Sequence, residues 1–425
     1  MTAETPGQTI VIGGGLAGLV AARELAREGR DVVIFEREKT VGGRVGTTHT
    51  DGFSFDHGFQ VLFPAYPAVR CALDIDALNL KRFRPGAMLV RPGERSIIAD
   101  PFRDPRAVTA SVLNRSVTFR DKLRVLGLRR ELAKTTPAEI LTHDDQTIRE
   151  FLEGRGFSTS FLQNFAAPFF GGITLDRSLE SSRFVFEFPF KMLSEGYATV
   201  PADGMAAIPN QLATSARAAG VRIERSTLVR SLTPTAHGAP VETSSETVDA
   251  RDVVVATDPA AASRLVDGVD IPTASRGCVT QYFSLPTRQQ LDTDGRLLLN
   301  VASPRPNHVA VLSSVAPSYA PSGTRLLSAT FLGTPEETDE VLAGEVSDAL
   351  ESWFPENRFD DLELLRTDRI ERAQLTQHPG FLSQRPGVDA PEGQVYLAGD
   401  YTRWSSIQGA LESGYLAAET VLDDE

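Results

Sequence analysis

Three glycines near the N-terminus have the spacing of a phosphate-binding turn. Gly13, Gly15 and Gly18 form the pattern G-x-G-x-x-G, and Glu36 follows 18 residues after the last of them. In such a turn the first glycine permits a tight bend, the second lets the backbone approach a pyrophosphate, and the third lets a helix pack closely on a strand. A carboxylate at the position of Glu36 accepts hydrogen bonds from a ribose diol. The pattern predicts a dinucleotide site for an unphosphorylated adenosine ribose.

A strand–helix–strand unit has to position these residues. Thr9–Ile12 is apolar and β-branched, which is typical of a buried parallel strand, and Val32–Phe35 is a second such run. Between the two runs, apolar residues recur at helical spacing from Leu16 onward. The free N–H groups of the first helical turn, which includes Leu16 and Ala17, present a positive potential to phosphates.

A second glycine-rich turn follows the second strand. Gly42 and Gly43 stand directly before Arg44, and Arg37, next to Glu36, is a further candidate for cofactor contact. Two adjacent glycines and an arginine make an anion-contacting turn. With this G-G-R segment the chain resembles the flavin-dependent amine oxidase and phytoene desaturase superfamily, whose N-terminal signature is the same unit followed by G-G-R. The alternative interpretation is an NAD-binding Rossmann domain with an ordinary loop.

The far end of the chain distinguishes the two interpretations. A buried strand ends at Gly399 and Asp400, and a short loop leads from there into a helix expected to start near Gly409. The resemblance implies that Asp400 hydrogen-bonds the ribityl chain or reaches the pyrophosphate of FAD. It also implies that the helix N-terminus points at the flavin ring, where its dipole stabilises negative charge. Contacts from the loop and the helix start are expected at Ser406, Ile407, Gln408 and Ala410.

The loop after the second turn carries further candidates. His57, Gly58, Phe59 and Gln60 resemble the family's F-D-x-G segment, which passes close to the flavin ring. His57 and Gln60 are candidate catalytic groups, but we favour the interpretation that they pack beside the ring and hold the loop by hydrogen bonds. The resemblance also implies that the backbone of Val229 contacts the adenine. No catalytic residue is assigned, because the flavin itself accepts the hydride and requires no protein base.

The resemblance implies an α/β fold in which a Rossmann-like, glutathione-reductase-type FAD-binding domain is interrupted by a discontinuous α+β substrate-binding domain. The FAD is expected to be noncovalent, because neither cysteine of the chain lies near the closing motif. A helix is expected at 107–113, within the substrate-binding part. The expected boundaries are 1–80, 196–275 and 385–425 for the FAD-binding domain, and 81–195 and 276–384 for the substrate-binding domain.

The substrate-binding part is unusually rich in phenylalanine. Eight phenylalanines lie between Phe161 and Phe190, and they predict either an ordinary core or, as we expect, an apolar tunnel that ends at the flavin. Burying an ammonium group there would need a compensating charge, and Glu187 is the only acid between Phe184 and Phe190. We therefore expect dehydrogenation of a small apolar substrate, a carotenoid or isoprenoid, as in phytoene desaturases. The alternatives are a flavin amine oxidase, a protoporphyrinogen-oxidase-like enzyme, and a lipid-binding escort protein without redox chemistry.

Composition restricts the partners. A net charge of −13 and a pI of about 5.1 argue against nucleic acid or anionic lipid as an electrostatic partner. Six histidines and two cysteines show no metal-ligand spacing, so no metal site is expected. The sequence has no apolar run of about 18 residues, and Met1–Gln8 does not resemble a signal peptide. We expect a cytoplasmic protein that contacts the inner face of the membrane only peripherally.

The basic residues suggest adaptation to salt. Only five of the 43 lysine and arginine residues are lysine, and acidic residues exceed basic ones. If the chain is salt-adapted, screening of carboxylate repulsion will raise its melting temperature by several degrees between low salt and molar KCl, where the Debye length is about 3 Å. Calorimetry across a KCl series measures this shift, and a flat or falling melting temperature would contradict it.

Overall fold

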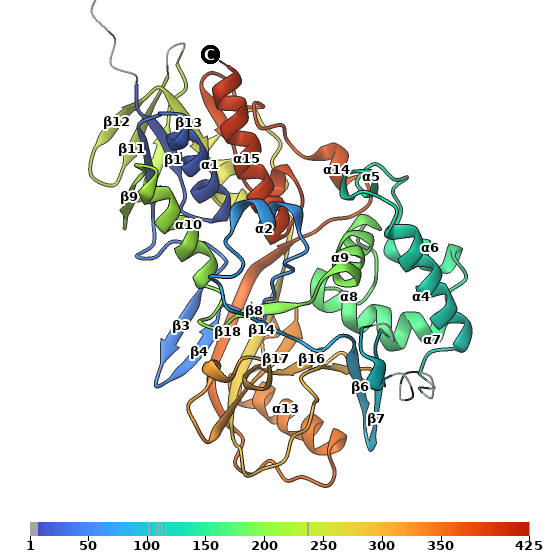
Figure 1. Cartoon of the computed structure of the whole chain (residues 1–425). Coiled ribbons are helices and arrows are strands. Elements are labelled where there is room, and N and C mark those ends of the chain that lie inside the picture. The colour runs from blue at the N-terminus through green and yellow to red at the C-terminus, as the bar shows by residue number, and fades with distance from the viewer. Residues whose placement is uncertain are drawn as a thin grey trace, which may run out of the picture.

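Two β-sheets, one parallel and one mixed, organise the chain (Figure 1). The computed structural model describes residues 7–100, 103–107, 109, 111, 114, 116–235 and 238–424. The parallel sheet lies at one end of the molecule and the mixed sheet at the other, and the long strands β14 (Ser275–Pro286) and β18 (Glu363–Leu375) extend from the second toward the first. The expected α/β fold class is confirmed.

The parallel sheet is assembled from three distant parts of the chain. In sheet order its strands are β19 (Val395–Leu397), β13 (Asp252–Val255), β1 (Thr9–Ile12), β2 (Val32–Glu36) and β9 (Arg222–Arg225). All of them except β9 are buried throughout, as expected for strands that are covered on both faces. Because the strands are parallel, their carboxyl ends meet at one edge, where sheets of this kind bind ligands.

Two helices at opposite ends of the sequence lie against each other beside this sheet. An added Cβ at Gly414 would lie 2.4 Å from the carbonyl oxygen of Ala17, so only glycine permits the approach of α15 to α1. The helices around the parallel sheet are α1 (Leu16–Arg27), α2 (Pro67–Ala72), α10 (Ala207–Ala218), α11 (Pro259–Leu265) and α15 (Ile407–Asp423) (Figure 1).

The mixed sheet has two faces of different character. Alternation along β14 directs Val279 and Phe283 into the core beneath helix α13 (Asp339–Trp353), and Thr280 and Tyr282 to the opposite face. In sheet order the strands are β18, β14, β17 (Thr324–Leu332), β16 (His308–Val311), β15 (Leu297–Asn300), β6 (Ala87–Arg91) and β7 (Glu94–Ile98).

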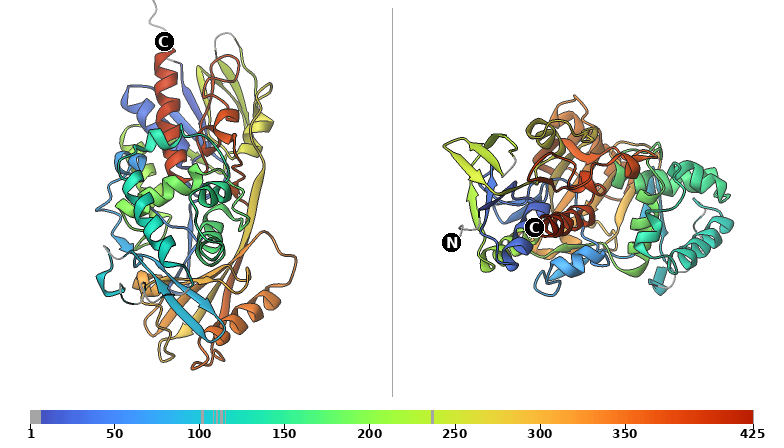
Figure 2. Two further views of the ribbon diagram at one scale, coloured as in Figure 1. Left: turned by 90° about the vertical axis from the view of Figure 1, so that its right-hand side faces the viewer. Right: turned by 90° about the horizontal axis from the view of Figure 1, so that it is seen from above.

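A group of helices between residues 119 and 195, here termed the helical lobe, stands to one side of both sheets (Figures 1 and 2). Its members are α4 (Phe119–Leu132), α5 (Pro137–Ile140), α6 (Ile148–Gly154), α7 (Thr159–Phe161), η2 (Leu162–Ala166), α8 (Ala167–Thr174) and α9 (Phe184–Glu195). Thr118, Thr136 and Thr147 start three of these helices as capping boxes. The helix expected at 107–113 falls largely on residues outside those that the structure describes.

Short elements complete the chain. A two-stranded hairpin, residues 47–56, lies beside the long strands β14 and β18 (Figure 1). A small three-stranded sheet lies beside the parallel sheet, at the opposite end of the molecule from the helical lobe (Figure 2). No helix within the described ranges has the length and apolar character that a membrane crossing requires. The elements not yet given are β3 (Thr47–Thr50), β4 (Phe53–Asp56), β5 (Leu80–Arg82), β8 (Thr199–Pro201), β10 (Val229–Leu232), β11 (Ala239–Thr243), β12 (Thr247–Ala250), α12 (Leu312–Val315), α14 (Phe381–Gln384), η1 (Pro105–Ala107), η3 (Pro317–Tyr319) and η4 (Asp400–Thr402).

A buried carboxylate fastens the two sheet regions together. Asp56, at the end of β4, accepts hydrogen bonds from the Tyr319 hydroxyl at 2.8 Å, the Thr47 hydroxyl at 2.5 Å and the backbone N–H of Met205 at 2.8 Å. The Tyr282 hydroxyl donates to the backbone carbonyl of the same aspartate at 2.5 Å. Burial raises the pKa of Asp56, and these donors oppose that effect.

The Asp56 network predicts a stability effect. Tyr319→Phe removes one donor from a buried carboxylate and should cost about 1–3 kcal/mol, because the remaining donors cannot replace it. Thermal unfolding should therefore show a lower melting temperature. Tyr66→Phe is the matched control, since the Tyr66 ring is also buried but its hydroxyl makes no hydrogen bond within the described part of the chain. Equal melting temperatures for the two variants would contradict the assignment.

Candidate cofactor and substrate cavity

One cavity of about 1980 Å³ extends from the carboxyl edge of the parallel sheet to the helical lobe. Of the residues predicted from the sequence to contact the cofactor, all except Gly18 and Gln408 line it. They are Gly13, Gly15, Leu16, Ala17, Glu36, Arg37, Gly42, Gly43, Arg44, His57, Gly58, Phe59, Gln60, Val229, Gly399, Asp400, Ser406, Ile407 and Ala410. Segments that are far apart in the sequence are therefore brought to one site.

The glycine turn between β1 and α1 combines tight packing with open space. Gly13 has a φ of +107°, a backbone conformation that favours glycine. An added Cβ on Gly18 would lie 2.1 Å from the carbonyl oxygen of Gly13, so Gly18 permits the close packing of α1 and does not line the cavity. A Cβ on Gly15 would meet nothing within 4 Å. Gly15 also starts α1 without a side-chain cap, which leaves the N–H groups of the first turn available to an anion.

Glu36 holds this turn in place. Its carboxylate accepts hydrogen bonds from the backbone N–H groups of Gly14 and Glu38, both at 2.7 Å. Each carboxylate oxygen has further lone pairs, and Glu36 lines the cavity, so it can also accept from a ribose diol as the spacing predicted. Arg37 lines the same end of the cavity and pairs with Glu38 at 3.0 Å.

An ion pair joins the two glycine motifs across the cavity. The guanidinium of Arg44 lies 2.6 Å from the carboxylate of Asp400, which is almost completely buried. The Ser405 hydroxyl donates to the other carboxylate oxygen at 2.8 Å. The negative charge of Asp400 raises the pKa of Arg44. Both carboxylate oxygens of Asp400 are thus held in place, and Arg44 supplies a cation beside the phosphate-binding turn.

The segment after β4 is held by its own side chains. The Gln60 amide nitrogen donates to the carbonyl oxygens of Arg44 and His57, both at 2.8 Å. The His57 Nε2 lies 3.1 Å from the Thr48 hydroxyl. These contacts agree with the expectation that both side chains hold the loop.

The start of α15 differs in one respect from the expectation. The helix begins at Ile407, two residues before Gly409, and the Ser406 hydroxyl caps it by accepting from the N–H of Gly409 at 2.8 Å. Gln408 points away from the cavity, because its Oε1 accepts from the backbone N–H of Ala68 at 2.9 Å. The Gln408 side chain thus anchors α2 to α15 and does not line the cavity.

Trp404 is a further residue of the cavity wall. Its indole is buried against the rings of Tyr66, Phe184 and Phe188, and its Nε1–H has no acceptor within the described chain. The open space at Gly15 and the uncapped start of α1 fit the phosphates of a dinucleotide. Sequence reasoning did not single out Trp404.

At its other end the cavity is lined by phenylalanine. Five of the eight phenylalanines predicted to form a tunnel line this end, and we term it the phenylalanine chamber: Phe161, Phe165, Phe169, Phe170 and Phe190. The Phe165 and Phe169 rings are stacked with their centroids 5.3 Å apart. Phe184, Phe186 and Phe188 do not line the cavity and pack in the core, so for these three the alternative interpretation holds.

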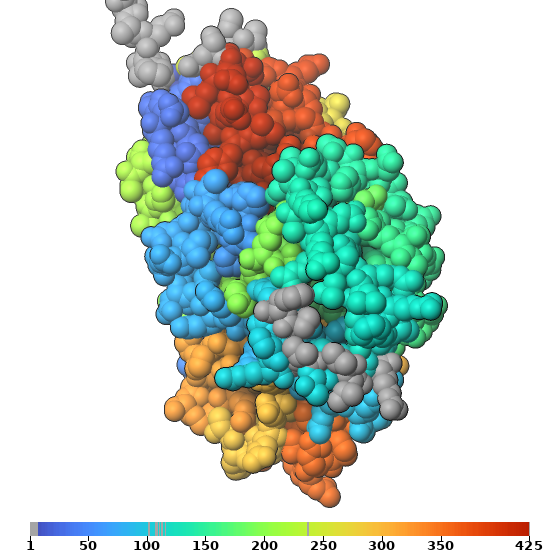
Figure 3. Space-filling model, turned by 45° about the vertical axis from the view of Figure 1, so that its right-hand side comes forward, coloured from blue at the N-terminus to red at the C-terminus, as the bar shows by residue number. Residues whose placement is uncertain are grey.

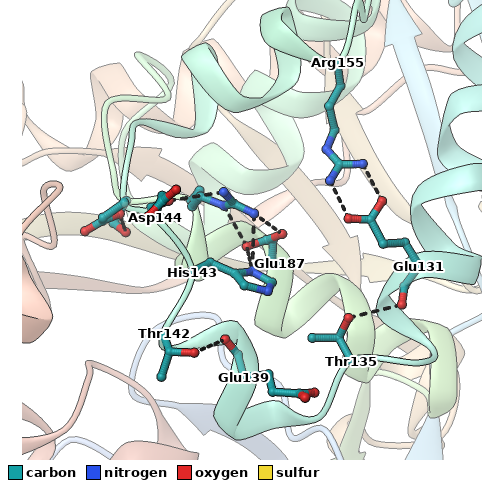
Figure 4. Close-up of polar contacts among 11 residues, drawn as sticks. Glu131, Thr135, Glu139, Thr142, His143, Asp144, Arg155 and Glu187 are labelled. Atoms are coloured by element: carbon teal, nitrogen blue, oxygen red, sulfur yellow. Dashed lines mark hydrogen bonds and ion pairs between the residues drawn. The ribbon is translucent and has the colours of Figure 1, made fainter.

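Glu187, the acidic residue in the first turn of α9, does not line the chamber. Glu187 is fully buried, and Arg183 donates to its two carboxylate oxygens at 2.9 and 3.0 Å. His143 approaches Glu187 from α5's C-terminal side, at 3.2 Å between Nδ1 and Oε2, and Figure 4 shows these two side chains pointing toward each other. Glu187 is thus neutralised within the helical lobe and does not place a negative charge in the cavity.

The glycine turn allows a direct test. Gly15→Val would fill the open space at the turn, and we expect the variant to fold but to purify with less than about a tenth of the normal flavin content. Gly344→Val is the matched control, because a Cβ at Gly344 also meets nothing within 4 Å but lies on the exposed side of α13. Absorbance of the purified proteins measures flavin content. A full complement in Gly15→Val would contradict the placement of the phosphate site.

Comparison with known proteins agrees with this geometry. The family described as "Flavin containing amine oxidoreductase" matches residues 16–422. The Carotenoid phi-ring synthase of Streptomyces griseus is 27% identical over 458 residues, which cover 97% of this chain and 87% of that protein. Protoporphyrinogen oxidase 2 of Arabidopsis thaliana is 28% identical over 166 residues, but these cover only 38% of this chain and 31% of that protein.

A solved structure shares the fold. A putative protoporphyrinogen oxidase from Exiguobacterium sp. 255-15 superposes with a TM-score of 0.76 at 19% identity, covering 99% of this chain and 100% of that one. The family match spans nearly the whole sequence, and the residues expected to contact the phosphates and ribose of the cofactor line one cavity, apart from Gly18. The chain therefore belongs to the flavin-containing amine oxidoreductase family and is an FAD-dependent oxidoreductase.

Proposed function

We propose that this enzyme dehydrogenates a long apolar substrate of the carotenoid or isoprenoid class. The observation that carries the proposal is the continuity of the cofactor site with the phenylalanine chamber in one cavity. Phenylalanine presents only apolar surface, so a hydrocarbon gains by entering the chamber and loses no hydrogen bonds. The resemblance to phytoene desaturases and the match to a carotenoid phi-ring synthase support this substrate class.

The distribution of acids in the cavity wall argues against an amine substrate. Asp100, which lines the cavity near the helical lobe, is held by Arg129 at 2.7 Å. Asp400 is held by Arg44, and Asp258 caps helix α11. An ammonium group that entered the phenylalanine chamber would lose its hydration without gaining a free carboxylate, which is unfavourable. A flavin amine oxidase or a protoporphyrinogen-oxidase-like enzyme is the alternative.

The residues of the protein orient the reactants and exclude water. When bound, FAD supplies the acceptor for a hydride from a C–H bond. Gly15 and Arg44 would hold the phosphates, the 57–60 loop would support the ring, and the chamber walls would confine the substrate chain, since all of them line one cavity. Because these cofactor residues are in place, a redox-inactive escort protein is the least favoured function.

A substrate panel tests the proposal. Anaerobic addition of phytoene to the FAD-loaded enzyme should bleach the flavin absorbance, whereas putrescine and protoporphyrinogen should not. Phe169→Asp places a charge in the chamber and should weaken the response to phytoene about tenfold or more, with unchanged flavin content. Rapid bleaching by the diamine and none by phytoene would instead establish an amine oxidase.

We also propose that the enzyme takes its substrate from a bilayer through helix α4. Phe119 and Leu123, one helical turn apart, line the cavity and are 65% and 53% exposed. The helix carries five basic residues against two acidic ones, in a protein whose net charge is −13. The helical lobe that contains α4 stands forward in Figure 3 (teal). Exposed apolar side chains flanked by basic ones at a cavity opening fit contact with a bilayer surface.

Vesicle binding tests this contact. The wild type should sediment with phosphatidylcholine vesicles that contain some anionic lipid, and the double variant Phe119→Asp, Leu123→Asp should bind about tenfold less. Val341→Asp is the matched control, because Val341 is an apolar side chain of similar exposure, 51%, on α13. Binding by the double variant equal to that of the control would contradict a role for α4, as would a wild type that does not sediment.

A further inference from the structure

Two arginines meet at one tyrosine in the wall of the cavity. The Cζ atom of Arg103 lies 4.1 Å from the centroid of the Tyr197 ring, and the Cζ atom of Arg82 lies 4.8 Å from the same centroid. Both distances are those of cation–π contacts. Arg103 and Tyr197 line the cavity, and Arg82 is exposed beside them. We term these three side chains the arginine–tyrosine cluster.

The polar groups of the cluster are accessible to a ligand. One nitrogen of the Arg103 guanidinium, Nη1, donates to the carbonyl oxygen of Leu193. The other N–H groups of Arg103 have no acceptor among the described residues, and the Tyr197 hydroxyl has no partner there either. None of these atoms is among the buried polar atoms that lack a partner, so each of them retains accessible surface. A ligand can therefore reach them without a rearrangement of the wall.

The positive charge of the cluster is not compensated by the protein. Within the described part of the chain, neither Arg82 nor Arg103 forms an ion pair, although the net charge of the chain is −13. The acids that flank Arg103 and Tyr197 in the sequence pair with other cations: Asp100 with Arg129, Asp104 with Arg296, and Glu195 with Lys191. Two guanidinium groups without a counter-ion, at the wall of a cavity, fit an anion.

A continuous wall connects the cluster with the phenylalanine chamber. Phe190 is a chamber residue, Leu193 follows one turn later on α9, and Tyr197 comes directly after the end of this helix. All three residues line the cavity, and the carbonyl oxygen of Leu193 holds the Arg103 guanidinium. A ligand whose apolar chain lies in the chamber can thus place one end at the cluster.

We infer that the arginine–tyrosine cluster binds an oxyanion, a carboxylate or a phosphate, at the end of the substrate's apolar chain. The inference rests on the proposed function and narrows the substrate to an acidic isoprenoid. A guanidinium donates paired hydrogen bonds to such oxygens, and the Tyr197 hydroxyl can donate another. An ammonium group would be repelled by the two arginines. The chamber walls would bind the chain, and the cluster would fix how far the chain enters.

Paired ligands test the inference. Retinoic acid and methyl retinoate share one polyene chain and differ in charge, as do geranylgeranyl phosphate and geranylgeraniol. The FAD-loaded wild type should bind the acid of each pair about tenfold more tightly than its neutral partner, because charge-assisted hydrogen bonds form only with the acid. Isothermal titration calorimetry measures these affinities. The pair with the larger preference identifies the head group.

Two variants and a control locate the effect. Arg103→Gln should abolish the preference for the acid, with unchanged affinity for the neutral ligand. Arg82→Gln should reduce the preference less, because solvent screens an exposed charge. Arg358→Gln is the matched control, since Arg358 is also exposed and forms no ion pair within the described ranges, but does not line the cavity. Flavin content and melting temperature should be normal in all three variants.

The outcomes separate this inference from the proposed function. Equal affinities of the wild type for acid and neutral ligand would overturn the inference, while bleaching of the flavin by phytoene would still support the proposed function. An equal loss of preference in Arg103→Gln and Arg358→Gln would also overturn it, because the preference would then reflect the overall charge of the protein. No binding of any of the four ligands, together with no bleaching by phytoene, would reject the proposed function itself.

Discussion

The ion pair between Arg44 and Asp400 joins the two ends of the chain at the cofactor site. One partner follows the second strand of the sequence and the other follows the last, and both strands belong to the same parallel sheet. Asp400 is buried, so its charge requires the guanidinium and the Ser405 hydroxyl. Because β1, β13 and β19 must be adjacent for this pair to form, the cofactor site exists only when the interrupted sheet is complete.

The remainder of the structure separates polar from apolar surface along one cavity. Glycines, Glu36 and Arg44 gather at the sheet edge, whereas aromatic side chains gather in the helical lobe. The acids Asp100 and Glu187, near the apolar end, are paired with Arg129 and Arg183. Neither carboxylate is therefore available to compensate a cation in the chamber. His308 adds a neutral polar group to the cavity wall: its Nδ1 is hydrogen-bonded to Asn307, and its Nε2 has no partner within the described chain.

The cofactor end was predictable because its chemistry constrains residue type. Only glycine tolerates the close approaches at Gly13 and Gly18, so the spacing of these residues is visible in the sequence. The chamber was predicted in part, because composition shows that phenylalanines are dense but not which face of α9 meets the cavity. Phe190 lines the cavity while Phe186 and Phe188 on the same helix are core. The helix propensity of these residues does not tell which of the phenylalanines of α9 face the cavity and which face the core.

Other features gave no local signal. Strand β18 is largely polar and only partly buried along Glu363–Leu375, so it lacks the alternation by which strands are recognised. Gln408 stands at the start of α15, where the sequence suggests a cofactor contact, and only the structure shows that its side chain turns to Ala68. His308 and Trp404 are single residues whose importance depends on contacts with distant segments, and no spacing rule points to them.

A structure of the FAD-loaded enzyme with a bound polyene tests the central claim most directly. The account predicts an extended ligand that runs along the stacked rings of Phe165 and Phe169 toward the 57–60 loop, with the Arg44–Asp400 pair intact beside the phosphates. A ligand bound outside the phenylalanine chamber would contradict the account. So would a small polar ligand bound beside the flavin ring while ordered water fills the chamber.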